Sequence, residues 1–256
     1  MDTISSKNNT VIKYAKKLLT SSKFRRDNCQ FVLEGARLCF DVLCSDYSVD
    51  ILLITQQAMD KYPHQSAQLA GAAGHSYLIT PDIAQKLGDT ATSQGVFAIC
   101  DIPVTDTGYG NRMVALDNVQ DPANVGAVIR TAEALGIDGV IVAGGCDIYN
   151  PKALRASMGS ALRINILICD DLADTITQLK SGGYCAYATV PDRTAQSITD
   201  VDFGDKTICV IGNEANGVSN EVMVSCDSRI TIPMLGRAES LNAGVAASIT
   251  MWEMMR

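Results

Sequence analysis

Residues 210–250 read VIGNEANGVSNEVMVSCDSRITIPMLGRAESLNAGVAASIT. The stretch contains the end of one short apolar run, 207–211, and the whole of another, 229–232, and both runs predict strands. The first runs into the turn 212–217, and the second into 233–242, after which small residues predict a helix from Ala243. Glycine lets the backbone approach a ligand closely, and loops after the strands of open α/β sheets bind ligands. Each loop carries a carboxylate and an asparagine, so the stretch predicts a ligand site, with ordinary strand–helix turns as the alternative.

Strands and helices alternate along the rest of the chain, which predicts an α/β fold. Before residue 104 we expect strands at 31–33, 51–55, 77–80 and 96–99, with helices at 10–23, from 35, and at 64–70 and 81–87. These elements predict a small α/β domain with a mostly parallel sheet. Strands at 113–116, 139–142, 164–168 and 184–189 follow, with a helix that ends at Gly136 and another that Asn150 and Pro151 begin. We therefore divide the chain into a domain at 1–104, a linker at 105–111 rich in Gly, Thr and Asp, and a domain at 112–256.

Composition narrows the class of protein. The 256 residues are 47% hydrophobic, no run approaches a membrane span, and the first residues form no signal peptide, so we expect a cytoplasmic protein. Nine scattered cysteines without a CxxC pair predict reduced, buried thiols. The two histidines, His64 and His75, both lie in the first half. The second half therefore cannot supply a Ser–His–Asp triad or a histidine-bound metal, and we expect no metal.

Basic charge gathers at the N-terminus of an acidic chain. The net charge of −7 lies entirely beyond residue 104, whereas the first 37 residues hold eight basic and three acidic positions. In the helix predicted at 10–23, the basic side chains lie off the apolar stripe, and further basic residues follow directly. The candidates for contact with RNA phosphates are Lys13, Lys16, Lys17, Arg25 and Arg26. A solvated helix face is the alternative.

The common nucleotide-binding motifs are absent, since neither GxGxxG after a strand nor GxxxxGK[ST] occurs. A nucleotide-dependent oxidoreductase therefore has no support beyond fold class. A set of polar residues at loop and helix positions remains: Asn124, Arg130, Glu214, Ser240 and Asn242. These residue types predict anion handling by Arg130 and hydrogen bonding by the others. They indicate a small-molecule or phosphate-containing substrate but do not identify the reaction.

Three segments resemble the motifs of one family. LDNVQDPANVGAVIRTAEALGIDGVIV (116–142), VIGNEANGVS (210–219) and IPMLGRAESLNAGVAASITMWE (232–253) are similar to the motifs of the SpoU, or TrmH-type, RNA ribose 2′-O-methyltransferases of the SPOUT superfamily. The resemblance covers nearly all of 112–256 in the family's order. FVLEGARLCFDVL (31–43) is similar to the start of the ribosomal-protein-like RNA-binding domain that often precedes the catalytic domain.

The resemblance implies a fold, a cofactor and roles for individual residues. The C-terminal segment would be threaded into a deep trefoil knot that binds S-adenosylmethionine, with the protein a homodimer through this domain. Carried over by motif, the cofactor-binding positions are Gly212, Ile232 and Leu241, with Thr189, Asn213 and Met234 as neighbours. Arg130 becomes the catalytic arginine, acting across the dimer interface, and Asn124, Glu214, Ser240 and Asn242 would organise Arg130 and the ribose. Arg155 matches a position near the RNA.

Two features depart from the family's pattern: Ala215 stands where a glycine is usual, and the chain is acidic for an RNA enzyme. Because the polar set is complete, we predict an S-adenosylmethionine-dependent RNA 2′-O-methyltransferase. Ribosomal RNA is favoured as the substrate by the extra N-terminal domain. The alternatives are a transfer RNA 2′-O-methyltransferase and a non-catalytic RNA-binding ribosome-assembly protein on the same fold.

Overall fold

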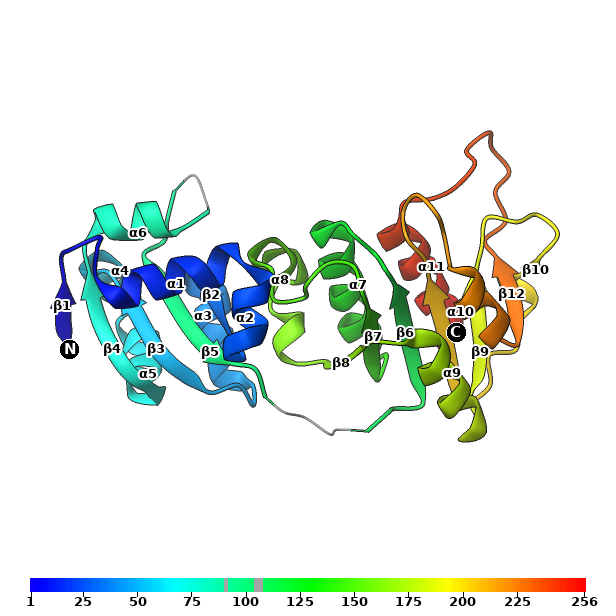
Figure 1. The fold of residues 1–256 in the computed structure, drawn as a ribbon, viewed down its shortest axis with the longest axis horizontal. Helices are drawn as coiled ribbons and strands as arrows, with labels where there is room; N and C mark the ends of the chain where they lie inside the picture. The colour runs from blue at the N-terminus through cyan, green and yellow to red at the C-terminus, as the bar shows by residue number, and fades with distance from the viewer. Residues whose placement is uncertain (90–91, 104–107) are drawn as a thin grey trace. The chain divides into compact units, whose positions relative to one another are not determined.

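Two β-sheets organise the chain, one in each of two packed units (Figure 1). A computed structural model describes residues 1–89, 92–103 and 108–256. The first unit contains the residues up to 105 together with Tyr149–Leu162, and the second contains 106–148 and 163–256. The linker predicted at 105–111 falls in part on 105–107, which lie outside the described residues. Within the described ranges, no helix has the length and apolar character needed to cross a membrane.

The N-terminal unit has a five-stranded sheet with the order β1-β4-β3-β5-β2. Its strands are β1 (Asp2–Ile4), β2 (Gln30–Glu34), β3 (Val49–Ile54), β4 (Ala73–Ile79) and β5 (Val96–Asp101). Its helices are α1 (Thr10–Thr20), α2 (Ser22–Asn28), α3 (Ala36–Asp41), η1 (Val42–Cys44), α4 (Gln56–Lys61), α5 (Pro63–Ala72), α6 (Pro81–Leu87), α8 (Pro151–Ser157) and η2 (Ser160–Leu162).

The prediction of a mostly parallel N-terminal sheet is confirmed only in part, because the sheet is mixed. β5 lies between β3 and β2 and runs antiparallel to both, whereas β1, β4 and β3 are parallel. β5 is buried along almost its whole length. A continuous apolar run of this kind indicates burial on both faces but carries no information about strand direction.

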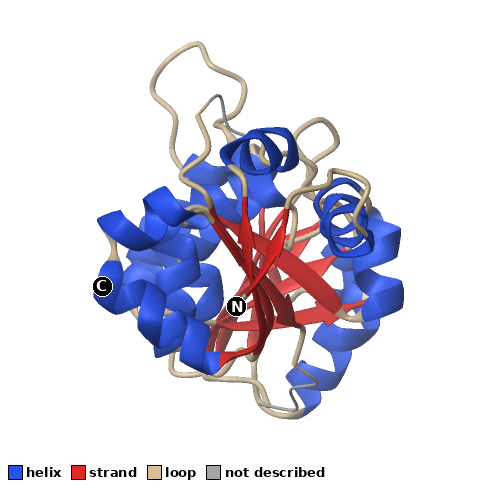
Figure 2. Ribbon diagram, turned by 90° about the vertical axis from the view of Figure 1, so that its left-hand side faces the viewer, coloured by secondary structure: helices blue, strands red, loops and turns tan. Residues whose placement is uncertain are grey.

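The C-terminal unit has a seven-stranded parallel sheet with the order β10-β12-β9-β11-β6-β7-β8. Its strands are β6 (Arg112–Asp117), β7 (Gly139–Ala143), β8 (Asn165–Cys169), β9 (Cys185–Thr189), β10 (Gln196–Ser197), β11 (Thr207–Ile211) and β12 (Ser228–Thr231). Its helices are α7 (Pro122–Leu135), α9 (Leu172–Ser181), η3 (Ile198–Asp200), α10 (Asn220–Ser225) and α11 (Ala243–Met255). Figure 2, in which the N-terminal unit faces the viewer, shows helices in blue on both sides of the strands in red.

The two faces of the C-terminal sheet are covered by different helices. On one face, Leu172, Ile176 and Leu179 of α9 and Val222 of α10 share an apolar cluster with the strands. On the other face, α11 packs against α7, β11 and β6. Because both faces are covered, the central strands are apolar along their length rather than alternating. The trefoil knot stays a prediction.

Local signals in the sequence set the ends of the main helices. Asp121 caps α7 by accepting the Ala123 N–H at 2.9 Å, and Gly136 ends it at φ +75°. Asn150 caps α8 in the same way through the Lys152 N–H. The predicted stop at Gly136 and the predicted start at Asn150 are therefore confirmed.

The nine cysteines are free thiols, but only some of them are buried as predicted. Cys29, Cys44 and Cys185 are exposed. Cys29 takes a left-handed conformation at the C-terminal end of α2, which holds it at the surface.

Candidate active site

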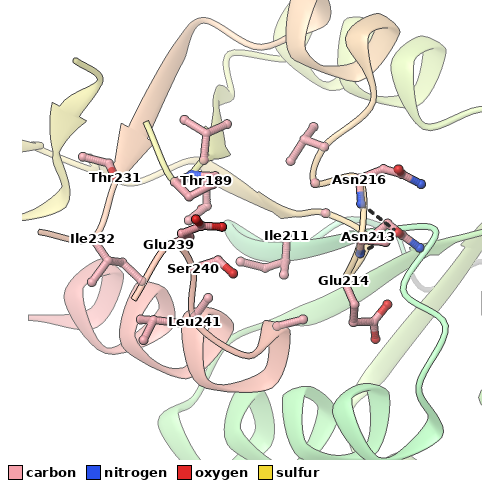
Figure 3. Close-up of a pocket in the computed structure, with 18 of the residues that line it drawn as sticks. Thr189, Ile211, Asn213, Glu214, Asn216, Thr231, Ile232, Glu239, Ser240 and Leu241 are labelled. Atoms are coloured by element: carbon pink, nitrogen blue, oxygen red, sulfur yellow. Dashed lines mark hydrogen bonds between the residues drawn. The ribbon is translucent and has the colours of Figure 1, made fainter. Parts of the chain in front are cut away.

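A cavity of about 460 Å³ opens at the carboxyl ends of three neighbouring strands, β9, β11 and β12 (Figure 3). Strand ends of parallel sheets are the usual place for ligands, because the loops that follow the strands converge there. All six predicted cofactor positions line this cavity: Thr189, Gly212, Asn213, Ile232, Met234 and Leu241. Glu214 and Ser240 also line it. The structure thus brings together residues from three separate parts of the sequence.

The loop after β11 is a closed turn. The backbones of Asn213 and Gly217 exchange two hydrogen bonds, at 3.0 and 2.9 Å, and the Asn213 side chain accepts the N–H groups of Ala215 and Asn216. A Cβ atom on Gly212 would lie 2.1 Å from the Gly217 carbonyl carbon, so no other residue fits there. The turn therefore holds its backbone close to the cavity without a side chain in between.

Glu214 leaves this turn and binds the start of α7. Its carboxylate accepts the backbone N–H groups of Gln120 and Asp121, both at 3.0 Å, and the Asn124 side-chain amide at 2.8 Å. Burial acts to raise the pKa of Glu214, but these hydrogen bonds outweigh it and lower the pKa to about 2. Glu214 is thus ionised at neutral pH, and its charge is used to fasten two loops together.

Asn124 continues the network to the last helix. Its side-chain oxygen accepts the Asn242 amide at 2.9 Å, and the Asn242 oxygen caps α11 by accepting the N–H groups of Gly244 and Val245. α7 and α11 lie close together here, since a Cβ atom on Gly244 would be 3.5 Å from the Ala127 Cβ. Asn242, Asn124 and Glu214 therefore form one chain of hydrogen bonds from α11 to the loop after β11.

Arg130 stands apart from this network. It lies on the exposed side of α7, and no hydrogen bond or ion pair to other described residues holds its guanidinium. It does not line the cavity. The single chain thus assembles four of the five predicted catalytic residues in or beside the cavity and leaves the arginine pointing outward.

The cavity fits a cofactor that is partly apolar and positively charged. Its walls include the apolar side chains of Ile211 on β11, Ile232 directly after β12 and Met223 on α10. Among the described residues that line it, Glu214 and Glu239 are charged and none is Lys, Arg or His. The hydroxyl oxygen of Thr189 is buried without a hydrogen-bond partner in the described structure, so it can bond to a ligand. S-adenosylmethionine has an apolar edge, polar groups and a sulfonium, and these features match the walls.

The predicted RNA-binding residues of the N-terminal unit differ in accessibility. Lys13, Lys16, Lys17 and Arg26 are exposed on α1 and α2. Lys16 also donates to the carbonyls of Lys86 and Leu87 at the end of α6, and Lys17 lies over the Phe24 ring. Lys16 and Lys17 follow Lys13 by three and four residues, so all three lysines lie on the same side of α1.

Arg25, which was also predicted to contact RNA phosphates, is buried, unlike the other candidates. Arg25 is 3% exposed, and its guanidinium donates to the Leu18 carbonyl at the end of α1. Helical periodicity alone did not reveal this, because α1 ends at Thr20 and a second helix begins at Ser22, which turns Arg25 inward.

Arg155, predicted to lie near RNA, is engaged within the N-terminal unit. Its guanidinium pairs with Glu34 at 3.4 Å and with Asp89 at 2.9 Å. The Glu34 side chain is only 3% exposed, and its carboxylate also accepts the Asp89 backbone N–H at 3.1 Å. Tyr149, on the same segment, stacks against Phe31 with ring centroids 4.5 Å apart.

The cavity contains a charged residue that the sequence did not mark as part of the site. Glu239 lines the cavity beside Ser240 and Leu241. The presence of a carboxylate in the second loop was the available signal, but nothing in the sequence showed that it faces the same space as Glu214. Among the described residues, no group of three or more His, Cys, Asp or Glu is arranged to hold a metal ion.

Comparison with known proteins gives two family matches. The SpoU rRNA Methylase family matches residues 111–252, and the MRM3-like substrate binding domain matches residues 9–98. The 23S rRNA (guanosine(2553)-2′-O)-methyltransferase RlmP of Bacillus subtilis is 29% identical over 255 residues, which cover 99% of both chains.

Two solved structures share the fold over nearly the whole chain. The SpoU methyltransferase AviRb from Streptomyces viridochromogenes, in complex with AdoMet, superposes with a TM-score of 0.85 at 28% identity and covers 97% of each chain. An AdoMet-bound rRNA methyltransferase from Sinorhizobium meliloti gives a TM-score of 0.86 at 27% identity, covering 99% of this chain and 97% of that one.

Proposed function

The chain belongs to the SpoU rRNA methylase family, and on that premise we propose that it methylates the 2′-hydroxyl of a ribose in 23S ribosomal RNA, with S-adenosylmethionine as the methyl donor. The observation that carries the proposal is the unbroken chain of hydrogen bonds Asn242–Asn124–Glu214 beside the cavity. The network holds together the loops after β6 and β11 and the start of α11, next to the cavity. The similarity to RlmP extends through the N-terminal unit, which favours ribosomal RNA over transfer RNA.

The residues around the cavity can hold the cofactor through backbone and hydroxyl groups. S-adenosylmethionine supplies an electrophilic methyl group carried on a positively charged sulfur. We assign its binding to Gly212, Ile232 and Leu241, which line the cavity from three segments, with Thr189, Asn213 and Met234 beside them. The buried Thr189 hydroxyl would gain its missing hydrogen bond from the cofactor.

Arg130 is proposed to orient the ribose and to stabilise the negative charge that develops on its 2′-oxygen. A free arginine is charged at any ordinary pH, so charge stabilisation is the role that its chemistry supports directly. Ser240, Asn124 and Asn242 would hold the ribose and the loops in place by hydrogen bonds, and Glu214 fixes Asn124. Because the methyl group moves in line from sulfur to oxygen, positioning contributes much of the acceleration.

A homodimer formed through the C-terminal unit is part of the proposal. α11 is apolar on all sides, yet Val245 and Trp252 are 47% and 60% exposed, and Ile249 lies between them on the same stripe. An apolar helix of this kind is normally covered on both sides. Arg130 lies on α7, the helix that packs against α11, so a second copy seated there would bring an arginine toward a neighbouring cavity.

The N-terminal unit is proposed to bind RNA through Lys13, Lys16, Lys17 and Arg26. Phosphate contacts of this kind are independent of base sequence and weaken with salt. Because the chain is acidic as a whole, a local basic face is needed to attract RNA. Since its proposed substrate is ribosomal RNA, we also propose that the protein works in the cytoplasm.

The test is transfer of labelled methyl groups from S-adenosylmethionine to unmodified 23S rRNA, 16S rRNA and transfer RNA, using wild type and Arg130→Ala. We expect label on 23S rRNA, at a position that becomes resistant to alkaline cleavage, and a loss of at least 100-fold in Arg130→Ala. Cofactor affinity should change less than twofold in this variant, because Arg130 does not line the cavity.

Label confined to transfer RNA would show that the proposed substrate is wrong and that the proposed reaction, 2′-O-methylation, is right. Absence of label on naked RNA and on partly assembled large ribosomal subunits, despite measurable RNA binding, would favour the binding protein instead. A parallel loss of activity and cofactor affinity in Arg130→Ala would contradict the role given to this residue.

A further inference from the structure

The charges on the walls of the cavity are all of one sign. Glu214 and Glu239 are the only ionisable side chains of formal charge among the described residues that line it. No lysine or arginine neutralises them from within the lining. A cavity of this kind attracts cations and disfavours anions.

The two carboxylates are held very differently. Both oxygens of Glu214 accept hydrogen bonds, two from backbone N–H groups and one from Asn124. In Figure 3 its carboxylate points toward the helices below the cavity. Glu239 is exposed, and no described residue donates a hydrogen bond to its carboxylate or pairs with it. Its charge is therefore available to a ligand.

The backbone around Glu239 holds it at the cavity. Glu239, Ser240 and Leu241 are consecutive and all line the same space (Figure 3). The segment is anchored on one side by Ile232, directly after β12, and on the other by Asn242, which caps α11 and bonds to Asn124. The anchor at Asn242 lies three residues from Glu239, which limits how far the carboxylate can leave the cavity.

We propose that Glu239 makes the cavity discriminate by charge at the cofactor's sulfur, so that the chain binds the sulfonium of S-adenosylmethionine more tightly than the neutral thioether of S-adenosylhomocysteine. This proposal rests on the proposed function. The product is neutral at sulfur, because the sulfur keeps the electron pair of the broken carbon–sulfur bond. The methyl group goes to the ribose oxygen, and the hydroxyl proton leaves to solvent. Loss of the attraction then favours release of the product.

The test compares the affinities of three ligands measured by calorimetry on the full-length protein. S-adenosylmethionine carries a sulfonium, sinefungin carries an ammonium at the corresponding position, and S-adenosylhomocysteine carries neither. Glu239→Gln keeps the size of the side chain and removes its charge. An attraction between unit charges close to a protein surface changes an affinity by about tenfold. We therefore expect Glu239→Gln to weaken the two charged ligands about tenfold and S-adenosylhomocysteine less than twofold.

Two controls separate this effect from a general loss of binding. Glu221→Gln removes the same charge from an exposed position at the start of α10 that does not line the cavity, and all three affinities should stay within twofold. Glu239→Asp keeps the charge and should retain most of the preference. Raising the salt concentration should reduce the wild-type preference, since exposed charges are screened.

Equal weakening of all three ligands in Glu239→Gln would overturn the proposal, because Glu239 would then bind a group that the ligands share, such as the amino group or the ribose. Unchanged affinities would overturn it as well. Failure of the wild type to bind any of the three ligands would instead refute the cofactor assignment, so the two failures are distinguishable.

Discussion

Replacement of Glu214 by glutamine tests whether the hydrogen-bond network stabilises the C-terminal unit. The carboxylate accepts three hydrogen bonds, at 2.8, 3.0 and 3.0 Å. In Glu214→Gln the single oxygen can keep the bonds from Asp121 and Asn124, but the new amide faces the Gln120 N–H, and two donors cannot bond. One charge-assisted bond is lost and two become neutral, which costs about 3 kcal/mol for a buried site. Since Glu214 is exposed, solvent screening reduces this expected loss of folding free energy to about 1 to 2 kcal/mol.

A change of that size lowers the unfolding temperature by about 3 to 6 °C for a unit of this length. The measurement is thermal unfolding at pH 7 of wild type, Glu214→Gln and the control Asp205→Asn, which neutralises an exposed carboxylate in the same unit. A Glu214→Gln variant that unfolds within 1 °C of wild type, or only as early as the control, would refute the role of the network.

The pH dependence gives a second readout of the same prediction. The pKa of Glu214 is lowered from its usual 4.5 to about 2, so the unfolded chain takes up the proton first as the pH falls. The stability contributed by the carboxylate is fully present above about pH 5 and is lost progressively toward pH 2. The gap between wild type and Glu214→Gln should therefore narrow between pH 5 and pH 2.5. A gap that stays constant over this range would contradict the lowered pKa.

Three further substitutions test other parts of the structure. Gly212→Ala places a Cβ atom 2.1 Å from backbone and should abolish cofactor binding in equilibrium dialysis, whereas Gly71→Ala, which meets nothing within 4 Å, should leave it unchanged. Trp252→Glu should convert a dimer to a monomer in light scattering, and a wild-type protein that is already monomeric would refute the proposed interface. Glu34→Ala leaves Arg155 without its buried partner and should destabilise the N-terminal unit by about 2 kcal/mol in urea unfolding, and a loss below about 0.5 kcal/mol would contradict the importance of the pair.

Local patterns in the sequence predicted local structure well. The apolar stripe of α7 is an example, because Val125, Val128, Ile129 and Ala132 are buried as its helical spacing requires. The ends of α7 and α8 follow from capping residues that act over two or three positions. Such signals lie within one element, so they can be read without knowing what the element packs against.

Features that depend on contacts between distant parts of the chain could not be predicted from local sequence patterns. The hydrogen bond between Asn242 and Asn124 joins residues 118 positions apart, and only the family resemblance placed them in one site. Nothing in the apolar run of β5 showed that it is antiparallel to its neighbours. Arg25 looked like a surface residue until the turn between α1 and α2 directed it inward. Each of these three features depends on the tertiary structure and not on the local sequence.

The segment Tyr149–Leu162 determines whether proteolysis in the linker separates the two units. It leaves the C-terminal sheet after β7 and returns to it at β8, yet it packs in the N-terminal unit through Tyr149, the Arg155–Glu34 pair and buried side chains of α8. The two units are thus joined at three points along the chain rather than at the linker alone. A protease that cuts the chain after Tyr109 should yield two fragments that still elute together. The C-terminal fragment carries residues 149–162, and this segment packs in the N-terminal unit.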